Sequence, residues 1–402
     1  MKRILYSTLI SLASLIFLLG VAPSGFAQSN TESNFRKPVI EKPATLGKPK
    51  CRTITTRTGN VMRYCSKAEP GDLISYDFDF ANKTYYAENL TNNDGRIYSG
   101  KFDRYFDDGT QTDLLAFEQR GKTYYAISSE NRFLATNFPA GTEKTSISSG
   151  INTKINNRNN FNAFDGYYLY FILNLDGNPN MDWGVAEFRA DEETPGEGYF
   201  LLAQYNTEDI LPDELTWDQI YEDLYSDNAR EGFYAIDRAE PSAFDIYFDD
   251  AYGDEYLPAT GYATSSEGVI IADLGYGNGY FQAVKISDVI GLQREYGYIQ
   301  SDVDFGSGAG LFQVSEDETE IAMQHYDDEG NEDISETLNL EEGGIENMYF
   351  TDLFDYGNTG ESTERLYLFV SGHFIMHFTI EVDAEGYGGK LLNYGVGAEM
   401  TD

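Results

Sequence analysis

One short segment of this chain carries side-chain oxygens at the spacing that a hard cation needs. It runs from residue 174 to residue 182, between apolar stretches at 167–173 and 183–188. Ca²⁺ takes about six to eight oxygen ligands, and alternate positions of a turning loop can point oxygens at one centre. We therefore predict a calcium site with these candidate ligands: Asn174, Asp176, Asn178, Asn180 through its backbone carbonyl, Asp182 and, as an additional ligand, Glu187.

The segment resembles the calcium loop of integrin-type FG-GAP propeller repeats, whose pattern is Asp-x-Asn/Asp-Gly-Asp-Gly-x-x-Asp between two strands. The resemblance covers residues 174–182 and implies side-chain ligation by Asn174, Asp176, Asn178 and Asp182, with Asn180 as a backbone ligand. Asn stands at the first and fifth positions, where the family has Asp, and Pro179 replaces the second glycine. Membership of this family would imply a β-propeller used for binding.

The alternative for this segment is a hairpin turn that uses Asn, Asp and Gly only for their backbone torsions. An EF-hand register from Asp176 to Glu187 is rejected, because Met181 stands where that loop needs glycine. With so few carboxylates, we expect calcium affinity in the weak extracellular class, ~10⁻⁴ to 10⁻³ M.

Residue types for catalysis are scarce. His325 stands alone in an acidic segment, and His373 and His377 are four residues apart on one expected strand, which puts their Cα atoms ~13 Å apart. They cannot share one metal ion, and the sequence has no Gly-x-Ser-x-Gly motif. We name no catalytic residue, although paired carboxylates with tyrosine platforms would suffice for glycoside hydrolysis.

The charge of the chain is very uneven. Of its 67 acidic residues, 52 lie after residue 160, where there are only seven lysines and arginines. Such a surface attracts cations and repels phosphates, so we expect cationic partners and exclude nucleic-acid binding. The alternative is adaptation of the surface to salty surroundings, in which case NaCl should stabilise the fold as well as CaCl₂ does.

The first 27 residues have the pattern of a bacterial-type secretory signal peptide. A basic start precedes an apolar stretch at 4–22, and Gly25 and Ala27 provide the small residues of a cleavage site. An uncleaved anchor is the alternative, because this stretch is about long enough to span a bilayer. We expect a secreted or periplasmic protein with no membrane span after signal removal.

The two cysteines agree with export. Cys51 and Cys65 flank the turn residues Arg57-Thr58-Gly59, and a three-residue hairpin loop there places the cysteines opposite each other. We predict a structural disulfide, since the spacing matches no metal-binding or redox motif. The hairpin, at 51–65, belongs to a basic, proline-rich spacer at 28–70.

Internal repeats and alternating patterns indicate an all-β fold. Phe102–Asp108 recurs at Phe244–Asp250 with six of seven positions identical, and Phe350–Gly357 is a looser copy. An apolar strand follows the acidic turn in the first and third copies, so the unit is strand, turn, strand. Apolar residues also alternate with polar ones over 365–382, which predicts one buried face and one wet face. The polar set includes His377, and Gly372 marks a bulge or a break between two strands.

These repeats favour antiparallel sheets arranged as a β-propeller, with tandem β-sandwich-like domains as the alternative. Only residues 213–224 have a helical pattern, with Asp213 as a candidate cap. Charge and composition divide the body into a near-neutral β region at 71–139, a polar linker at 140–160 and a strongly acidic β domain at 161–402.

The sequence thus predicts an exported, acidic β-repeat protein that binds Ca²⁺ and serves in extracellular binding or surface interaction. The expected partners are cations and a cell-surface or extracellular glycan or protein. The alternative is a secreted carbohydrate-active enzyme or carbohydrate-binding protein that uses paired carboxylates and tyrosine platforms.

Overall fold

The computed structural model describes most of the chain after Cys51, with gaps. The chain divides into two units, Met1–Pro38 and Val39–Asp402, and every described residue belongs to the second. The predicted signal peptide and the loop at Arg57–Gly59 lie outside the described residues. The described residues are 51, 61–68, 72–91, 96–106, 112–129, 132–140, 147–152, 164–174, 180–207, 210–237, 242–249, 256–264, 268–273, 280–286, 292–293, 295–302, 306–327, 329–355, 363–382 and 388–400.

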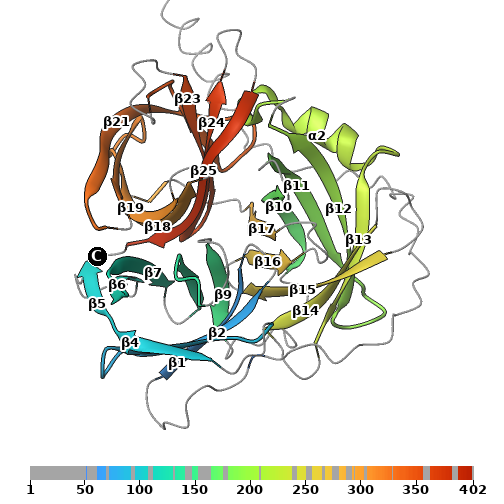
Figure 1. The fold of residues 1–402 in the computed structure, drawn as a ribbon. Helices are drawn as coiled ribbons and strands as arrows, with labels where there is room; N and C mark the ends of the chain where they lie inside the picture. The colour runs from blue at the N-terminus through green and yellow to red at the C-terminus, as the bar shows by residue number, and fades with distance from the viewer. Residues whose placement is uncertain are drawn as a thin grey trace, which may run out of the picture. The chain divides into compact units, whose positions relative to one another are not determined.

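The first sheet contains nine antiparallel strands in the order β4-β3-β2-β1-β9-β8-β7-β6-β5 (Figure 1). β1 is an interior strand of this sheet, because it pairs with β2 on one side and with β9 on the other. The buried core of this first sheet includes Tyr76, Phe78 and Phe117. The strands are β1 Val61–Ala68, β2 Leu73–Asp79, β3 Thr84–Asn89, β4 Ile97–Lys101, β5 Asp103–Phe106, β6 Thr112–Gln119, β7 Lys122–Ser129, β8 Phe133–Thr136 and β9 Ser148–Asn152.

The second sheet is a closed barrel of eight antiparallel strands, in which β10 pairs with both β11 and β17. Its interior is a packed core, since Tyr168, Phe188 and Phe281 belong to one buried cluster. The strands are β10 Gly166–Asn174, β11 Asn180–Ala190, β12 Glu197–Asn206, β13 Arg230–Ile236, β14 Ala243–Asp249, β15 Tyr256–Thr264, β16 Val269–Asp273 and β17 Tyr280–Lys285.

The third sheet is another closed eight-stranded antiparallel barrel, which β18 and β25 close by pairing with each other. Tyr298, Phe312 and Leu368 belong to its buried cluster. The strands are β18 Glu295–Asp302, β19 Gly306–Val314, β20 Glu320–Tyr326, β21 Glu332–Glu342, β22 Met348–Thr351, β23 Glu364–Ser371, β24 Phe374–Val382 and β25 Gly388–Glu399.

Glycines inside both barrels accept aromatic rings from neighbouring strands. A β carbon on Gly198 would overlap the ring of Tyr234, and one on Gly310 would overlap the ring of Tyr298. Each ring therefore packs directly against the backbone of the adjacent strand, where a side chain on the glycine would not fit. This packing accounts for part of the high content of tyrosine and glycine.

The helix α2 (Trp217–Leu224) packs on the outer side of β11 and β12, after a 3₁₀ turn at Pro212–Glu214. Ile220 and Leu224 are its buried residues. The predicted helix is confirmed over Trp217–Leu224, but Thr216 precedes it as the cap instead of Asp213. The backbone N–H of Thr216 donates to Oε1 of Gln219 at 3.0 Å.

The all-β prediction and the antiparallel pairing are confirmed, and the predicted disulfide joins Cys51 to Cys65 with their Cα atoms 5.8 Å apart. Strands β10–β25 form two closed barrels and not the blades of a propeller. Alternation with period two is common to blades and barrels, so the pattern alone does not distinguish them. The segment 140–160, predicted as a linker, contains β9, which completes the first sheet.

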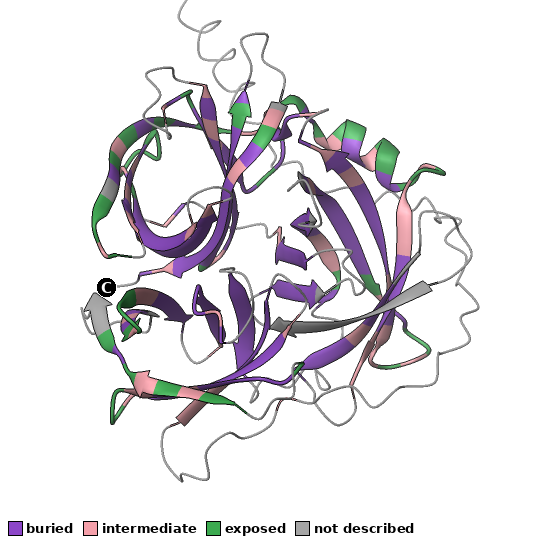
Figure 2. Cartoon of the chain, in the orientation of Figure 1, coloured by how far each residue is buried: buried purple, intermediate pink, exposed green. Residues whose placement is uncertain are grey.

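The stretch 365–382 folds as a hairpin whose turn contains Gly372 at φ 54°. The prediction of one wet face was wrong for β24, because both of its faces are buried (Figure 2). Phe378 packs against Tyr367 on the outer side, whereas His377 pairs opposite Leu368 and faces the barrel interior. Among the described residues, no helix is long and apolar enough to cross a membrane.

Candidate functional site

The predicted calcium loop joins β10 to β11. Asn174 and Asn180 form the last pair of this hairpin, so the predicted setting of a loop between two strands is confirmed. Asp176 and Asn178 lie in residues 175–179, outside the described residues. Calcium ligation by this loop stays a prediction.

Asp182, the last residue of the predicted loop, lies on β11 two residues after Asn180, and its carboxylate already accepts hydrogen bonds from two side-chain amides. It accepts hydrogen bonds from Nδ2 of Asn206 at 3.0 Å and from Nε2 of Gln204 at 2.7 Å. Arg230 in turn donates to Oε1 of Gln204 at 3.0 Å. Burial raises the pKa of Asp182, while the two amide donors act in the opposite direction. Asp182 can still act as a calcium ligand, because each of its carboxylate oxygens has a further lone pair.

Glu187 does not join Asp182 in one site. The two residues are five positions apart on β11, so they point to opposite faces of the sheet and are about 16 Å apart along the strand. Both oxygens of Glu187 are engaged, because Arg189 donates to Oε1 at 2.6 Å and Tyr225 donates to Oε2 at 2.7 Å. The alternation of a strand therefore argues against Glu187 as an additional ligand.

An aromatic cluster fastens α2 to the outside of the second barrel. The hydroxyls of Tyr167 on β10 and Tyr221 on α2 share a hydrogen bond of 2.6 Å, and Trp217 packs edge-on to Tyr167. Burial raises the pKa of Tyr167 well above its usual range. Sequence reasoning did not identify this cluster; the outward position of Tyr167 on its strand was the available signal.

Asp213, in the 3₁₀ turn before α2, binds two side chains of β23. Nη1 of Arg365 donates to its Oδ2 at 2.7 Å, and the hydroxyl of Tyr367 donates to its Oδ1 at 2.6 Å. The residue that the sequence indicated as a helix cap thus ties the α2 segment to the third barrel.

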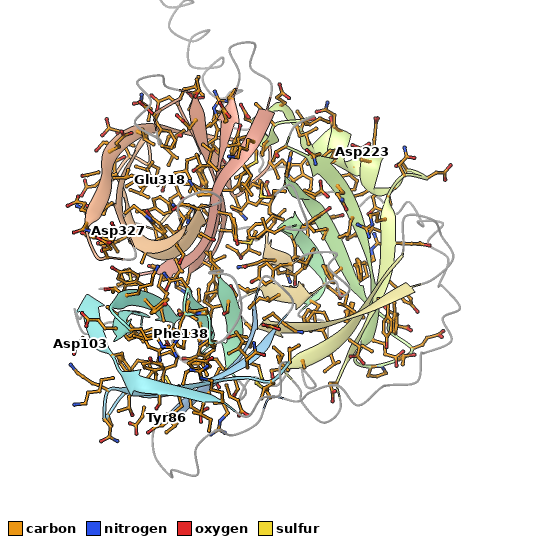
Figure 3. The ribbon with its side chains drawn as sticks, viewed as in Figure 1. Tyr86, Asp103, Phe138, Asp223, Glu318 and Asp327 are labelled. Carbon is orange, nitrogen blue, oxygen red and sulfur yellow. A yellow bond between two sulfur atoms is a disulfide. The ribbon has the colours of Figure 1, made fainter. Side chains whose placement is uncertain are left out.

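Strands β19–β22 of the third barrel and their turns carry many exposed aspartates and glutamates. Residues 295–364 contain 20 aspartates and glutamates and no lysine or arginine. Figure 3 labels Glu318 and Asp327 on this barrel. We call the exposed acids of β19–β22 and their turns the acidic wall: Glu316, Asp317, Glu318, Glu320, Glu329, Glu332, Glu341, Glu342, Glu346 and Asp352.

Local hydrogen bonds keep parts of this region charged. The hydroxyl of Ser315 donates to Asp317 at 2.8 Å and holds the pKa of that carboxyl below its usual range. Other outward positions of β21 carry small polar residues, such as Thr337 and Asn339, instead of bases. Acids crowded in this way repel one another, which makes the association of cations favourable.

No three His, Cys, Asp or Glu side chains come together to hold a metal ion in the part of the chain that the structure describes. The two histidines predicted in polar surroundings are buried instead. His325 and His377 lie in the interior of the third barrel, where burial lowers their pKa values to about 4 and about 3. His373 is in the β23–β24 turn and bonds to Glu399.

No protein-family model matches this chain, and no curated protein matches it. Among solved structures, the transferrin binding protein B of Neisseria meningitidis serogroup B matches with a TM-score of 0.27 and 9% identity. A mutant transferrin binding protein B from Haemophilus parasuis matches with a TM-score of 0.23 and 10% identity. Both alignments cover 82% of this chain but 66% of the other, so the chain spans slightly less than two thirds of those proteins.

A protein of unknown function from the DUF3598 family of Nostoc punctiforme also matches, with a TM-score of 0.17 and 7% identity. That alignment covers 85% of this chain and 95% of the other. At these TM-scores none of the three structures assigns a fold family or a function to the chain.

Proposed function

We propose that this protein is exported and binds cationic partners through the acidic wall of its third barrel. The observation that carries the proposal is the set of exposed acids on β19–β22, in a stretch of 70 residues without lysine or arginine. The disulfide between Cys51 and Cys65 supports export, because such bonds persist in oxidising compartments.

Surface binding suits the architecture of the described barrels. Aromatic and aliphatic side chains occupy most of the interior of both closed barrels, which leaves no space there for a macromolecular partner. A partner therefore meets the outer surface, where the acids lie. A field of one sign speeds the encounter with an oppositely charged partner and makes its affinity depend on salt.

Ca²⁺ is part of the same proposal. Asp182 provides a carboxylate beside the β10–β11 turn, and the predicted ligands Asn174, Asp176, Asn178 and Asn180 surround that turn in the sequence. A site with these ligands would bind weakly, as is usual in calcium-rich extracellular fluids, and would hold the two strands together at their ends.

The test is the affinity of the full chain for octalysine, measured by calorimetry. The variant combines Glu320→Gln, Glu341→Gln and Glu346→Gln, three exposed residues of the acidic wall. We expect it to bind at least about fivefold more weakly than the parent, because each lost carboxylate removes roughly 0.3–1 kcal/mol of attraction at low salt.

The matched control removes the same charge elsewhere, with Glu192→Gln, Glu193→Gln and Glu222→Gln on the second barrel and α2. This control should bind octalysine nearly as well as the parent does. Equal weakening in both variants would show that net charge alone attracts the peptide. That result, or no binding by the parent at low salt, would refute a role for the acidic wall.

A further inference from the structure

Among the described residues of the third barrel, two fully buried side chains in the interior have no hydrogen-bond partner. They are His377 on β24 and Asn393 on β25, both 0% exposed. The unpaired atoms are both ring nitrogens of His377 and both amide atoms of Asn393. An unpaired buried polar group costs ~1–3 kcal/mol, and native proteins commonly satisfy such groups with water, an ion or a ligand.

Both side chains face the same interior. His377 pairs with Gly395, and Thr379, two residues further along β24, pairs with Asn393. The ring of His377 meets the rings of Tyr298 and Phe312 edge-on, with centroids 4.8 Å and 5.0 Å away. Asn393 and Gly395 are two residues apart on one strand and therefore share a face.

Further polar groups stand on the neighbouring strand β18. Asp302 pairs opposite Asn393, and its Oδ1 accepts a hydrogen bond of 3.0 Å from Nε2 of Gln300. The ring of His325 is stacked with the ring of Tyr298, and its Nδ1 is 3.4 Å from the tyrosine hydroxyl and its Nε2 4.0 Å from Oδ2 of Asp302. These groups surround His377 and Asn393 with a polar cluster in an otherwise apolar barrel.

The protonation state of the cluster decides which ligand it accepts. Burial keeps both histidines neutral at pH 7, so each ring offers one donor and one acceptor. An anion would meet the carboxylate of Asp302 in a barrel wall that is already acidic. A metal ion would need more ligating side chains than the described residues bring together.

We propose that His377 and Asn393 form an interior binding site for a small uncharged molecule that carries a hydrogen-bond donor beside an acceptor. A primary carboxamide has this pattern, since it can pair with the Asn393 amide through two hydrogen bonds and leave one group for His377. Eight-stranded barrels are wide enough to enclose one small ligand among their side chains. The site is separate from the acidic wall and does not depend on it.

The probe is acetamide, and the measurement is the ¹⁵N spectrum of the histidine ring nitrogens in the full chain. The chain has only three histidines, so each ring can be assigned by substitution. We expect a saturable shift of the His377 ring nitrogens and no shift of His373, which lies in an exposed turn. N,N-dimethylacetamide, which has no N–H donor, should not produce the saturable shift.

The variant Asn393→Leu should abolish the response of His377 to acetamide while the fold is retained. Because the comparison of the two amides uses only the parent chain, the proposal is tested even where that variant does not fold. A cluster that holds water only would give no saturable shift with acetamide. That outcome, or an equal response to both amides, would overturn the proposal.

Discussion

The ring of His377 packs directly against the backbone of Gly395, its partner on the adjacent strand of the third barrel. A β carbon on Gly395 would overlap Nε2 and Cε1 of the imidazole and would also crowd the carbonyl oxygen of Ile299. The rings of His325 and Tyr298 also pack closely against glycines of an adjacent strand, Gly308 and Gly310 respectively. Glycines at these positions thus let ring-bearing side chains enter the barrel, and histidine is one of them.

The substitution Gly395→Ala should destabilise the protein by about 1–3 kcal/mol, because the new methyl group overpacks the His377 ring. Urea unfolding measures the change. Part of the loss should be recovered when Ala also replaces His377, with a coupling of about 0.5 kcal/mol or more in the double-mutant cycle.

Gly297→Ala is the matched control on neighbouring β18. Its methyl group would meet the flexible side chain of Met400, whose Sδ is 3.0 Å away, so the cost should be clearly smaller than at Gly395. Equal costs at the two glycines would contradict the packing that we describe.

The protein should become less stable as the pH is lowered, because its buried histidines stay neutral in the folded state. Burial lowers the pKa of His325 to about 4 and that of His377 to about 3, below the ordinary value of 6.5. The unfolded chain therefore takes up protons that the folded chain does not, and stability is fully present above about pH 6.5 and declines below it.

The measurement is the free energy of unfolding between about pH 7 and about pH 5, where each buried histidine contributes a slope of up to ~1.4 kcal/mol per pH unit. The variant His325→Phe should show a shallower slope than the parent. The carboxylates of Asp302 and Asp327 lie near this histidine and are retained in both proteins. Parallel slopes would mean that His325 is protonated in the fold.

Asp213→Ala should loosen the α2 segment. Both oxygens of Asp213 accept hydrogen bonds from β23, so the loss leaves Arg365 and Tyr367 without this acceptor and should cost about 1–3 kcal/mol. Hydrogen exchange over 212–224 should become faster. Asp218→Ala, at an exposed site on α2, should change stability by no more than about 0.5 kcal/mol. Unchanged exchange in Asp213→Ala would exclude this anchoring role.

Removal of the disulfide should cost about 3 kcal/mol, because Cys51 and Cys65 close a loop with a sequence separation of 14. The double variant Cys51→Ala/Cys65→Ala should unfold at a lower urea concentration than the oxidised parent. The reduced parent should match the variant. A stability unaffected by reduction would show that the bond does not constrain the unfolded chain.

Local pattern predicted the features that depend on local chemistry. The cysteines met as predicted, and the helix formed at Trp217–Leu224, where apolar residues recur at helical spacing. The strands that follow the first and third copies of the repeat are β6 and β23. Each of these features depends on residues close together in the sequence or on one turn.

Closure of the barrels could not be predicted in this way. It depends on the pairing of β10 with β17 and of β18 with β25, which joins segments about a hundred residues apart. The burial of His377 was missed for the same reason, because alternation tells which residues share a face but not that both faces of β24 are covered. The two-residue period of a strand does, however, predict that Asp182 and Glu187 point to opposite faces of the sheet.

The central claim, that the acidic surface binds cations specifically, is tested most directly by thermal unfolding of the metal-stripped chain in CaCl₂ and in NaCl of equal ionic strength. We predict that CaCl₂ raises the melting temperature by several degrees more than NaCl does, and that chelation reverses the gain. Equal stabilisation by the two salts would contradict the claim, since it would show that the acids need only general screening.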